Sequence, residues 1–443
     1  MKFRLFSNYL TDNELIGKLW GLKRPFSFLL LGSMQLYNAL AIITVLAALF
    51  GYINYRFIRL PDTIGVMVIS LVASLGVVVI GLLEPSVFQQ ATAFIRGIDF
   101  YTVLVKIMLG FLLFAGAIHV NGKALNNERV SVLTFSTISV LLSTALVGGL
   151  LYLLCLLLHQ PIPFVYCLLF GALISPTDPI AVLSILRQAG ISPSLEIKIT
   201  GESLFNDGVG IVIFLCIYQV AEAGLGQLSA VRVILLFLQQ AGGGLLLGVA
   251  LGYAGYLLLK SIDHYQVELL ITIAIVLGGN LLADRLQVSA PLAMVMAGLI
   301  TGNKTRLQGM SETSRDYIDK FWGMTDNLLN AVLFLLIGLE MLVIPFRPSL
   351  LWLGLGAIPI VLAARYISVL LPISLLRYNT CFEKNAIGIL TWGGLRGGLS
   401  VALALSIPAS MYGEHFVAMT YIIVLFSIIV QGLTIGKFAG RLI

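Results

Sequence analysis

Charged side chains are scarce in this chain, because Asp, Glu, Lys and Arg make up only 11% of its 443 residues. A soluble protein of this length needs charge on roughly a quarter of its residues to cover its surface. Apolar residues reach 59%, and the mean hydropathy is +1.00. These values exclude a soluble protein with an ordinary hydrated surface and indicate that most of the surface faces lipid.

Cysteine and histidine are equally rare, with four residues of each type. The cysteines lie in or beside apolar segments and form no C-x-x-C pair, so neither a zinc site nor a disulfide framework is expected. The net charge of +6 arises from short basic clusters between apolar runs, not from a basic stripe with interleaved aromatic residues. We therefore expect no nucleic-acid partner and no cofactor.

Thirteen apolar runs approach the length of about 20 residues that spans a bilayer. They cover residues 36–57, 63–83, 100–119, 130–157, 163–188, 197–221, 231–260, 267–284, 288–302, 322–344, 349–376, 384–407 and 416–436. The ninth run is short, so twelve spans is the alternative count. Brief connections predict an all-α polytopic membrane protein with a single transport domain over residues 34–443. Residues 1–33 are predicted to be an N-terminal arm, and its role stays open.

The basic residues of the loops give an orientation. Fifteen Lys and Arg residues follow odd-numbered spans or lie in the C-terminal tail, whereas four follow even-numbered spans. By the positive-inside rule the first set is cytoplasmic, which places the C-terminus inside and the N-terminus outside a cell membrane. Five basic residues in the arm of residues 1–33 argue against this orientation.

Helix breakers occur at matching positions in two halves of the chain. The fifth run is interrupted by Ser-Pro-Thr-Asp-Pro at 175–179 and the twelfth by Gly-Gly-Leu-Arg-Gly-Gly at 393–398. Six-helix units over about 36–221 and 267–436, linked by the single helix 231–260, would enter the membrane from opposite sides. Inverted repeats with matched breaks are typical of secondary transporters and indicate a binding site near the bilayer midplane.

Five charged side chains are predicted to lie deep in these spans, where each costs roughly 2.5–3.5 kcal/mol on insertion scales. They are Asp178, Glu202, Asp207, Arg365 and Arg396. Ser203 and Asp207 are four residues apart, so they share a helix face that offers hard oxygen ligands to a small alkali cation. Pro176 and Pro179 leave carbonyl groups free around Thr177, which are further candidate ligands.

Opposite charges on different helices are expected to neutralise one another, as Glu202 and Arg365 would. Arg396, inside the second break, is expected to offset the charge at the ends of the broken helices. For the fifth run, a plain proline kink capped by Asp178 is the alternative interpretation.

Three motifs occur in a fixed order: SPTDPIAV at 175–182, GESLFNDG at 201–208 and WGGLRGG at 392–398. Together they resemble the monovalent cation:proton antiporters of the sodium/proton exchanger type, which include prokaryotic antiporters and animal exchangers. The likeness runs from about Met34 to the C-terminus. It implies thirteen helices with crossing discontinuous helices five and twelve, a homodimer, and an elevator-like core that moves against a dimerisation domain.

The resemblance also implies the roles of individual residues. Those implied to bind the cation or the proton are Asp207, Asp178, Ser203, Asn206 and Thr177, with Na⁺ held at Asp207, Ser203 and Thr177. Glu202 and Arg365 match the interhelix ion pair of the family. One departure is at Ala115, since several prokaryotic members carry an acidic residue after the corresponding Leu-Leu-Phe. Affinity and ion preference therefore stay open.

The predicted function is a secondary active transporter, not an enzyme, that exchanges Na⁺ for H⁺ and serves pH homeostasis. Asn206 carries no exchangeable proton, so one-for-one electroneutral exchange is expected. A K⁺/H⁺ antiporter remains open because carboxylate and carbonyl ligands do not fix ion size, as does transport of Li⁺. More distant alternatives are a cation channel, which needs a continuous polar pore, and an intramembrane hydrolase, which lacks the G-x-S-x-G elbow because Phe205 takes its last position.

Overall fold

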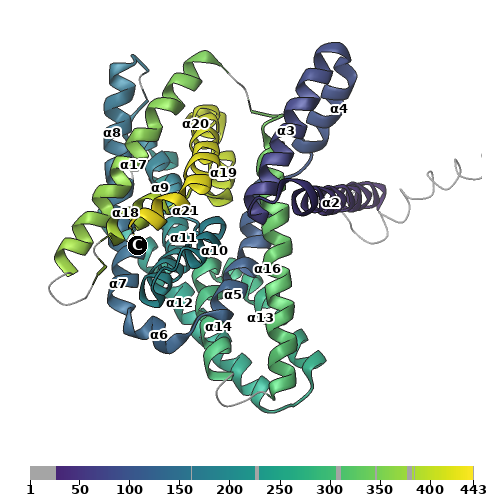
Figure 1. The fold of residues 1–443 in the computed structure, drawn as a ribbon, viewed down its shortest axis with the longest axis vertical. Helices are drawn as coiled ribbons and strands as arrows, with labels where there is room; N and C mark the ends of the chain where they lie inside the picture. Colours follow the sequence, from purple (N-terminus) through teal and green to yellow (C-terminus); the bar gives the residue numbers. More distant parts are fainter. Residues whose placement is uncertain are drawn as a thin grey trace, which may run out of the picture.

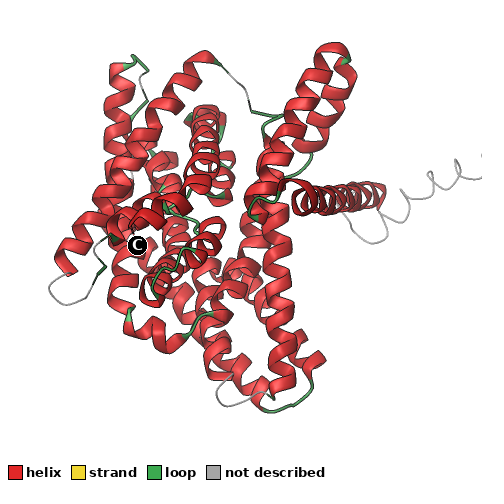
Figure 2. Ribbon diagram, in the orientation of Figure 1, coloured by secondary structure: helices red, strands yellow, loops and turns green. Residues whose placement is uncertain are grey.

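The computed structural model describes residues 26–160, 162–224, 229–305, 311–344, 347–376, 382–383 and 385–442. These ranges are helices joined by short loops, and no strand occurs in them (Figure 1, Figure 2). Ten helices of the described part are long and apolar enough to cross a membrane. The chain is therefore a multi-pass membrane protein, and the predicted all-helical fold class is confirmed. Most of the predicted N-terminal arm, residues 1–25, lies outside the described residues.

Two bundles lie beside one another in the fold, and each packs mainly within itself (Figure 1). The core bundle comprises α7 (Arg129–Thr134), the π-helical turn η3 (Phe135–Ser139), α8 (Val140–Leu157), α9 (Phe164–Ile174), α10 (Ile180–Gln188), α11 (Pro193–Ala223), α17 (Pro348–Leu376), α18 (Ala386–Trp392), α19 (Gly398–Leu405), α20 (Gly413–Phe426), η6 (Ser427–Gln431) and α21 (Gly432–Leu442). The flanking bundle comprises α2 (Phe26–Ile53), η1 (Asn54–Ile58), α3 (Asp62–Leu83), α4 (Pro85–Arg96), η2 (Thr102–Met108), α5 (Leu109–His119), α12 (Ala230–Lys260), α13 (Tyr265–Leu286), α14 (Ala290–Ile300), η4 (Thr301–Thr305) and α16 (Glu312–Glu340). The short helix α6 (Gly122–Asn127) connects α5 to α7.

The outer surface of the flanking bundle is apolar. Along α12 only 11% of the most apolar window is buried, and Val231, Leu235, Leu238 and Leu246 are all exposed. A soluble protein rarely leaves an apolar surface of this length in water. These side chains therefore face lipid or another membrane protein.

Glycines let α12 approach α14 closely. A Cβ atom on Gly244 would lie 2.6 Å from the carbonyl oxygen of Ser289, and one on Gly248 would lie 2.4 Å from that of Ala293. Gly252 faces Ala297 in the same way. Membrane helices pack through such small residues because lipid supplies no hydrophobic force between them.

Both predicted helix breaks are present, and they meet. The fifth run divides into α9 and α10 around Pro176 and Pro179, and the twelfth divides into α18 and α19. The backbone N–H of Asp178 in the first break donates to the carbonyl of Leu395 in the second at 2.8 Å. Backbone groups that lack helical hydrogen bonds must find other partners at membrane depth. Here the N–H of one break and the carbonyl of the other satisfy each other.

The predicted start of the tenth span, residue 322, is wrong. Helix α16 begins at Glu312, where the hydroxyl of Ser311 caps it by accepting from the Ser314 N–H at 3.3 Å. Its first turns are polar and therefore gave no apolar signal, although capped backbone continues through them. As a result, Asp326 lies in the middle of a 29-residue helix.

Further differences concern the first helix, an additional short helix and the broken spans. Helix α2 starts at Phe26, so residues 26–33 of the predicted arm are helical, and the amphipathic helix α4 was not predicted. Three of the thirteen predicted spans are not continuous long helices. They are the two broken helices and the short α14, which continues into η4. The count of thirteen and the inverted repeat stay predictions.

Candidate functional site

Asp178 is fixed at the first helix break by its own backbone surroundings. Its carboxylate accepts a hydrogen bond from the N–H of Ile180 at 3.0 Å and so caps the start of α10. An anion at this position is favourable because the N-terminus of a helix carries partial positive charge. The carboxylate thus stays near the crossing of the two broken helices.

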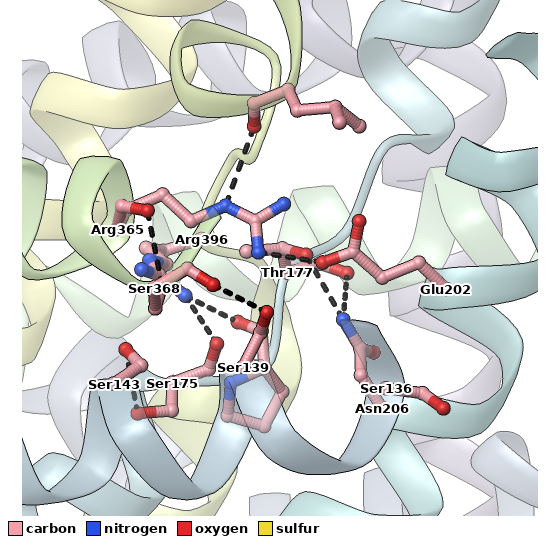
Figure 3. A network of polar contacts seen from close by, with 12 residues as sticks. Ser136, Ser139, Ser143, Ser175, Thr177, Glu202, Asn206, Arg365, Ser368 and Arg396 are labelled. Atoms are coloured by element: carbon pink, nitrogen blue, oxygen red, sulfur yellow. Dashed lines mark hydrogen bonds and ion pairs between the residues drawn. The ribbon is translucent and has the colours of Figure 1, made fainter. Parts of the chain in front are cut away.

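Arg396 in the second break binds the end of the helix in the first. Its guanidinium Nη1 donates to the carbonyl oxygens of Ser175 and, at 3.1 Å, Pro176 (Figure 3). Its backbone N–H donates to the Ser427 hydroxyl at 3.0 Å. The side chain is only 2% exposed. The last carbonyls of α9 carry partial negative charge, so the buried cation and the helix end stabilise one another.

A cavity of about 700 Å³ reaches this crossing, and three of the five candidate binding residues line it. They are Asp178, Ser203 and Asp207, all partly accessible. Exposed polar side chains, including His119 and Arg187, line the same cavity and mark its mouth. The arrangement offers two carboxylates and a hydroxyl to a cation that arrives from water.

The other two candidates, Thr177 and Asn206, bind each other and do not line this cavity. The Asn206 amide donates to the Thr177 hydroxyl at 2.9 Å and to its carbonyl at 3.3 Å (Figure 3). These bonds tie α11 to the first helix break. The Oδ1 of Asn206 is buried and has no hydrogen-bond partner among the described residues.

Glu202 and Arg365 form a buried ion pair between α11 and α17. The Arg365 Nη1 lies 2.5 Å from the Glu202 Oε1, and Arg365 Nε donates to the carbonyl of Leu390 at 3.3 Å (Figure 3). A void of about 10 Å³ beside the pair, about the size of one water molecule, is lined by Thr177 and Gly394. The pair and the bond to Leu390 join α11, α17 and α18 within the core bundle.

Two polar residues of the cavity wall were not among the predicted site residues. Asp326 and Asn330 on α16 both line the cavity, from the flanking bundle. A charged residue in an apolar helix was the available signal. A helix that begins at residue 322, as predicted, places Asp326 near its N-terminal end, whereas α16 begins at Glu312 and places Asp326 at its middle.

No group of His, Cys, Asp and Glu that could hold a resident metal ion occurs in the described part of the chain. Cys155, Cys167 and Cys216 are buried free thiols, and Cys381 lies outside the described residues. The cavity therefore offers oxygen atoms, which suit hard monovalent cations better than soft metals.

Gly397, in the second break, packs directly against the Asp178 side chain and so limits its position. A Cβ atom at Gly397 would lie 2.6 Å from the Asp178 Oδ2 and 2.8 Å from its Cβ. We expect Gly397→Ala to displace this carboxylate and to lower the transport rate by about tenfold or more, since displacement of about 1 Å at a site can cost a hundredfold. Liposome flux assays would measure this. Gly278→Ala, with no atom within 4 Å of its new Cβ, is the control and should transport normally.

Comparison with known proteins gives one consistent result. The family model described as "Sodium/hydrogen exchanger, transmembrane" matches residues 44–439. The chain is 46% identical over 416 residues to the Na⁺/H⁺ antiporter NhaP of Pseudomonas aeruginosa, covering 91% of this chain and 96% of that protein. It is 32% identical to the Na⁺/H⁺ antiporter NhaH of Halobacillus dabanensis over 87% of this chain and 93% of that one.

A solved structure shows the same fold. The sodium proton antiporter MjNhaP1 from Methanocaldococcus jannaschii at pH 8 aligns with a TM-score of 0.71 over 92% of this chain and 99% of that chain, at 22% identity. Similarity at this level supports the all-helical architecture described above.

Proposed function

Because the chain belongs to the sodium/hydrogen exchanger family, we propose that it exchanges Na⁺ for H⁺ across the cell membrane, with Asp207 as the residue that binds either ion. The observation that carries the proposal is the cavity in which Asp207, Asp178 and Ser203 meet at the crossing of two broken helices. Both named relatives are called Na⁺/H⁺ antiporters.

Competition between the two ions explains exchange. An unpaired carboxylate is strongly unfavourable outside water, whereas a bound proton or a bound cation neutralises it. Asp207 can therefore cross the barrier as Asp–H or as Asp–Na⁺, but not as the bare anion. Each crossing then carries one ion in one direction, and return requires the other ion.

The buried charges around the site support a stoichiometry of one to one. Glu202 and Arg365 neutralise each other, Arg396 binds the carbonyl oxygens of Ser175 and Pro176, and Asp178 caps the start of α10. Asp207 has no ion-pair partner within the described part of the chain, and one monovalent ion neutralises its charge. Asn206 beside it adds no further ionisable group.

Alternating access follows from the division into two bundles. In the proposed elevator motion the core bundle carries Asp178 and Asp207, and the flanking bundle stays in place and joins two copies as a homodimer. The cavity mouth lies beside His119 and Arg187, at the ends of α5 and α10. The positive-inside rule assigns this side to the cytoplasm, so we infer that the structure represents an inward-open state.

Purified protein in acid-loaded liposomes tests the proposal. External Na⁺ is expected to raise the internal pH, and Li⁺ is expected to act likewise. A response to K⁺ alone would keep the exchange mechanism and change the substrate. No cation-dependent proton movement at all would contradict the proposal.

The stoichiometry is tested by finding the Na⁺ and H⁺ gradients at which net ion exchange stops. For one-for-one exchange this balance point should not move when valinomycin and K⁺ set the membrane potential at 0 or −100 mV. If one net charge moved per cycle, 100 mV would contribute about 2.3 kcal/mol and shift the balance point roughly fiftyfold. Internal pH dyes at several imposed Na⁺ gradients measure this, and a shift of that size would exclude electroneutral exchange.

A further inference from the structure

Two polar residues on α16 form part of the cavity wall without any role in the mechanism described so far. Asp326 and Asn330 are one helical turn apart, and the Asn330 Nδ2 donates to the Asp326 Oδ1 at 3.1 Å. Both residues line the cavity that also contains Asp178 and Asp207. They belong to the flanking bundle, whereas Asp178 and Asp207 belong to the core bundle.

Asn330 has an oxygen atom that lacks a partner. The residue is 2% exposed, and its Oδ1 is buried without a hydrogen bond from any described residue. A buried amide oxygen without a hydrogen bond is unfavourable unless a ligand or water satisfies it. Because the Nδ2 of the same amide is bound to Asp326, the free oxygen and the carboxylate are held together at the cavity wall.

Asp326 has no ion-pair partner within the described part of the chain. The basic group that acts on it electrostatically is His119, an exposed side chain whose ring nitrogens contact the carbonyl oxygens of Ala115 and Asp319. Asp326 and Asp178 line the same cavity from opposite bundles. The cavity thus presents carboxylates from both bundles, and an unneutralised carboxylate in such a position attracts cations.

We propose that Asp326 and Asn330 form a second site for a monovalent cation, which takes the ion from water in the cavity before Asp207 binds it. The ligands are hard oxygen atoms, a carboxylate and an amide carbonyl, which suit alkali cations. This inference rests on the proposed exchange at Asp207.

Its location on the flanking bundle gives the site a directional effect. In the elevator motion Asp207 moves with the core bundle and Asp326 does not. The second site therefore assists binding only from the side of the membrane on which the cavity opens in this structure. A residue with a purely structural role would alter transport from both sides.

The experiment measures Na⁺ dependence separately from each side, in right-side-out and inside-out membrane vesicles. For Asp326→Asn we expect the KM for Na⁺ presented from the cavity side to rise about tenfold, equivalent to about 1.4 kcal/mol, with kcat within about twofold of wild type. The KM from the opposite side should not change. Labelling of Asn121→Cys at the cavity mouth by an impermeant maleimide identifies which vesicles expose that side.

Matched variants separate the site from general effects of charge. Asp316→Asn removes an exposed carboxylate on the same helix, which pairs with Lys320 and lies outside the cavity wall, and it should leave both KM values unchanged. Asp326→Glu should restore most of the affinity. Asn330→Ala keeps the carboxylate and should raise the same KM by about threefold, which provides a test if Asp326→Asn fails to fold.

The outcomes distinguish this inference from the proposed function. An unchanged KM in both Asp326→Asn and Asn330→Ala, with Asp207→Asn inactive, would overturn the second site and leave exchange at Asp207 intact. A fall in kcat with equal KM values on both sides would also overturn it, because that pattern indicates a structural role. Full transport in Asp207→Asn would instead contradict the proposed function.

Discussion

Asp207→Asn is expected to reduce Na⁺-driven proton movement to the level of protein-free liposomes. The amide has nearly the same size as the carboxylate, but it has no charge to hold a cation and no exchangeable proton to return. Both halves of the cycle fail together. Internal pH after addition of Na⁺ to acid-loaded liposomes measures the loss, and the reverse proton gradient provides a second test of the same variant.

The control is the same substitution, Asp to Asn, at a position outside the cavity. Asp284→Asn replaces an exposed carboxylate at the end of α13, away from the cavity, and should transport at the wild-type rate. Because a ligand that binds the folded protein stabilises it, Na⁺ should raise the melting temperature of wild type and of Asp284→Asn, but not of Asp207→Asn. Transport by Asp207→Asn above background would show that another group exchanges the ions.

The parts of this fold that could be predicted are those encoded locally. The paired prolines 176 and 179 and the clustered glycines at 393–398 occur at matching positions, so both breaks could be predicted, whereas the single prolines 359 and 372 lie inside the continuous helix α17. Buried charges were equally visible, because an isolated charge in an apolar run needs a compensating partner. Glu202 could be matched with Arg365 on this argument, and the structure brings the two together at 2.5 Å.

The parts that could not be predicted depend on how the bundles meet. Helical spacing places Asn206 on the face next to Asp207. It does not show that the Asn206 amide donates to the Thr177 hydroxyl at 2.9 Å and does not face the cavity. The polar first ten residues of α16 gave no apolar signal, so the helix was predicted to begin at residue 322. Asp326 was therefore placed near its N-terminal end and not among the deep charges. Only the packing of α16 beside the core bundle shows that this carboxylate shares a cavity with Asp178.

Loss of one partner of the Glu202–Arg365 pair is expected to give the largest change in stability. The side chains of Arg365 and Glu202 are only 6% and 3% exposed, so either charge left alone is buried without compensation. Removing one partner of such a pair costs about 3–5 kcal/mol. Glu202→Gln and Arg365→Met should therefore each lower the thermal unfolding midpoint of the purified protein in detergent by many degrees.

The double variant Glu202→Gln/Arg365→Met shows whether the broken ion pair itself causes the loss of stability. When both charges are removed no uncompensated charge remains, so its loss of stability should be much smaller than the sum of the two single losses. The exposed pair of Arg187 and Glu196 is the control, because the same cycle there should give coupling of about 1 kcal/mol or less. Additive losses at Glu202 and Arg365 would mean that each side chain stabilises the core bundle through its other contacts, such as the bond from Arg365 to Leu390, and not through the ion pair.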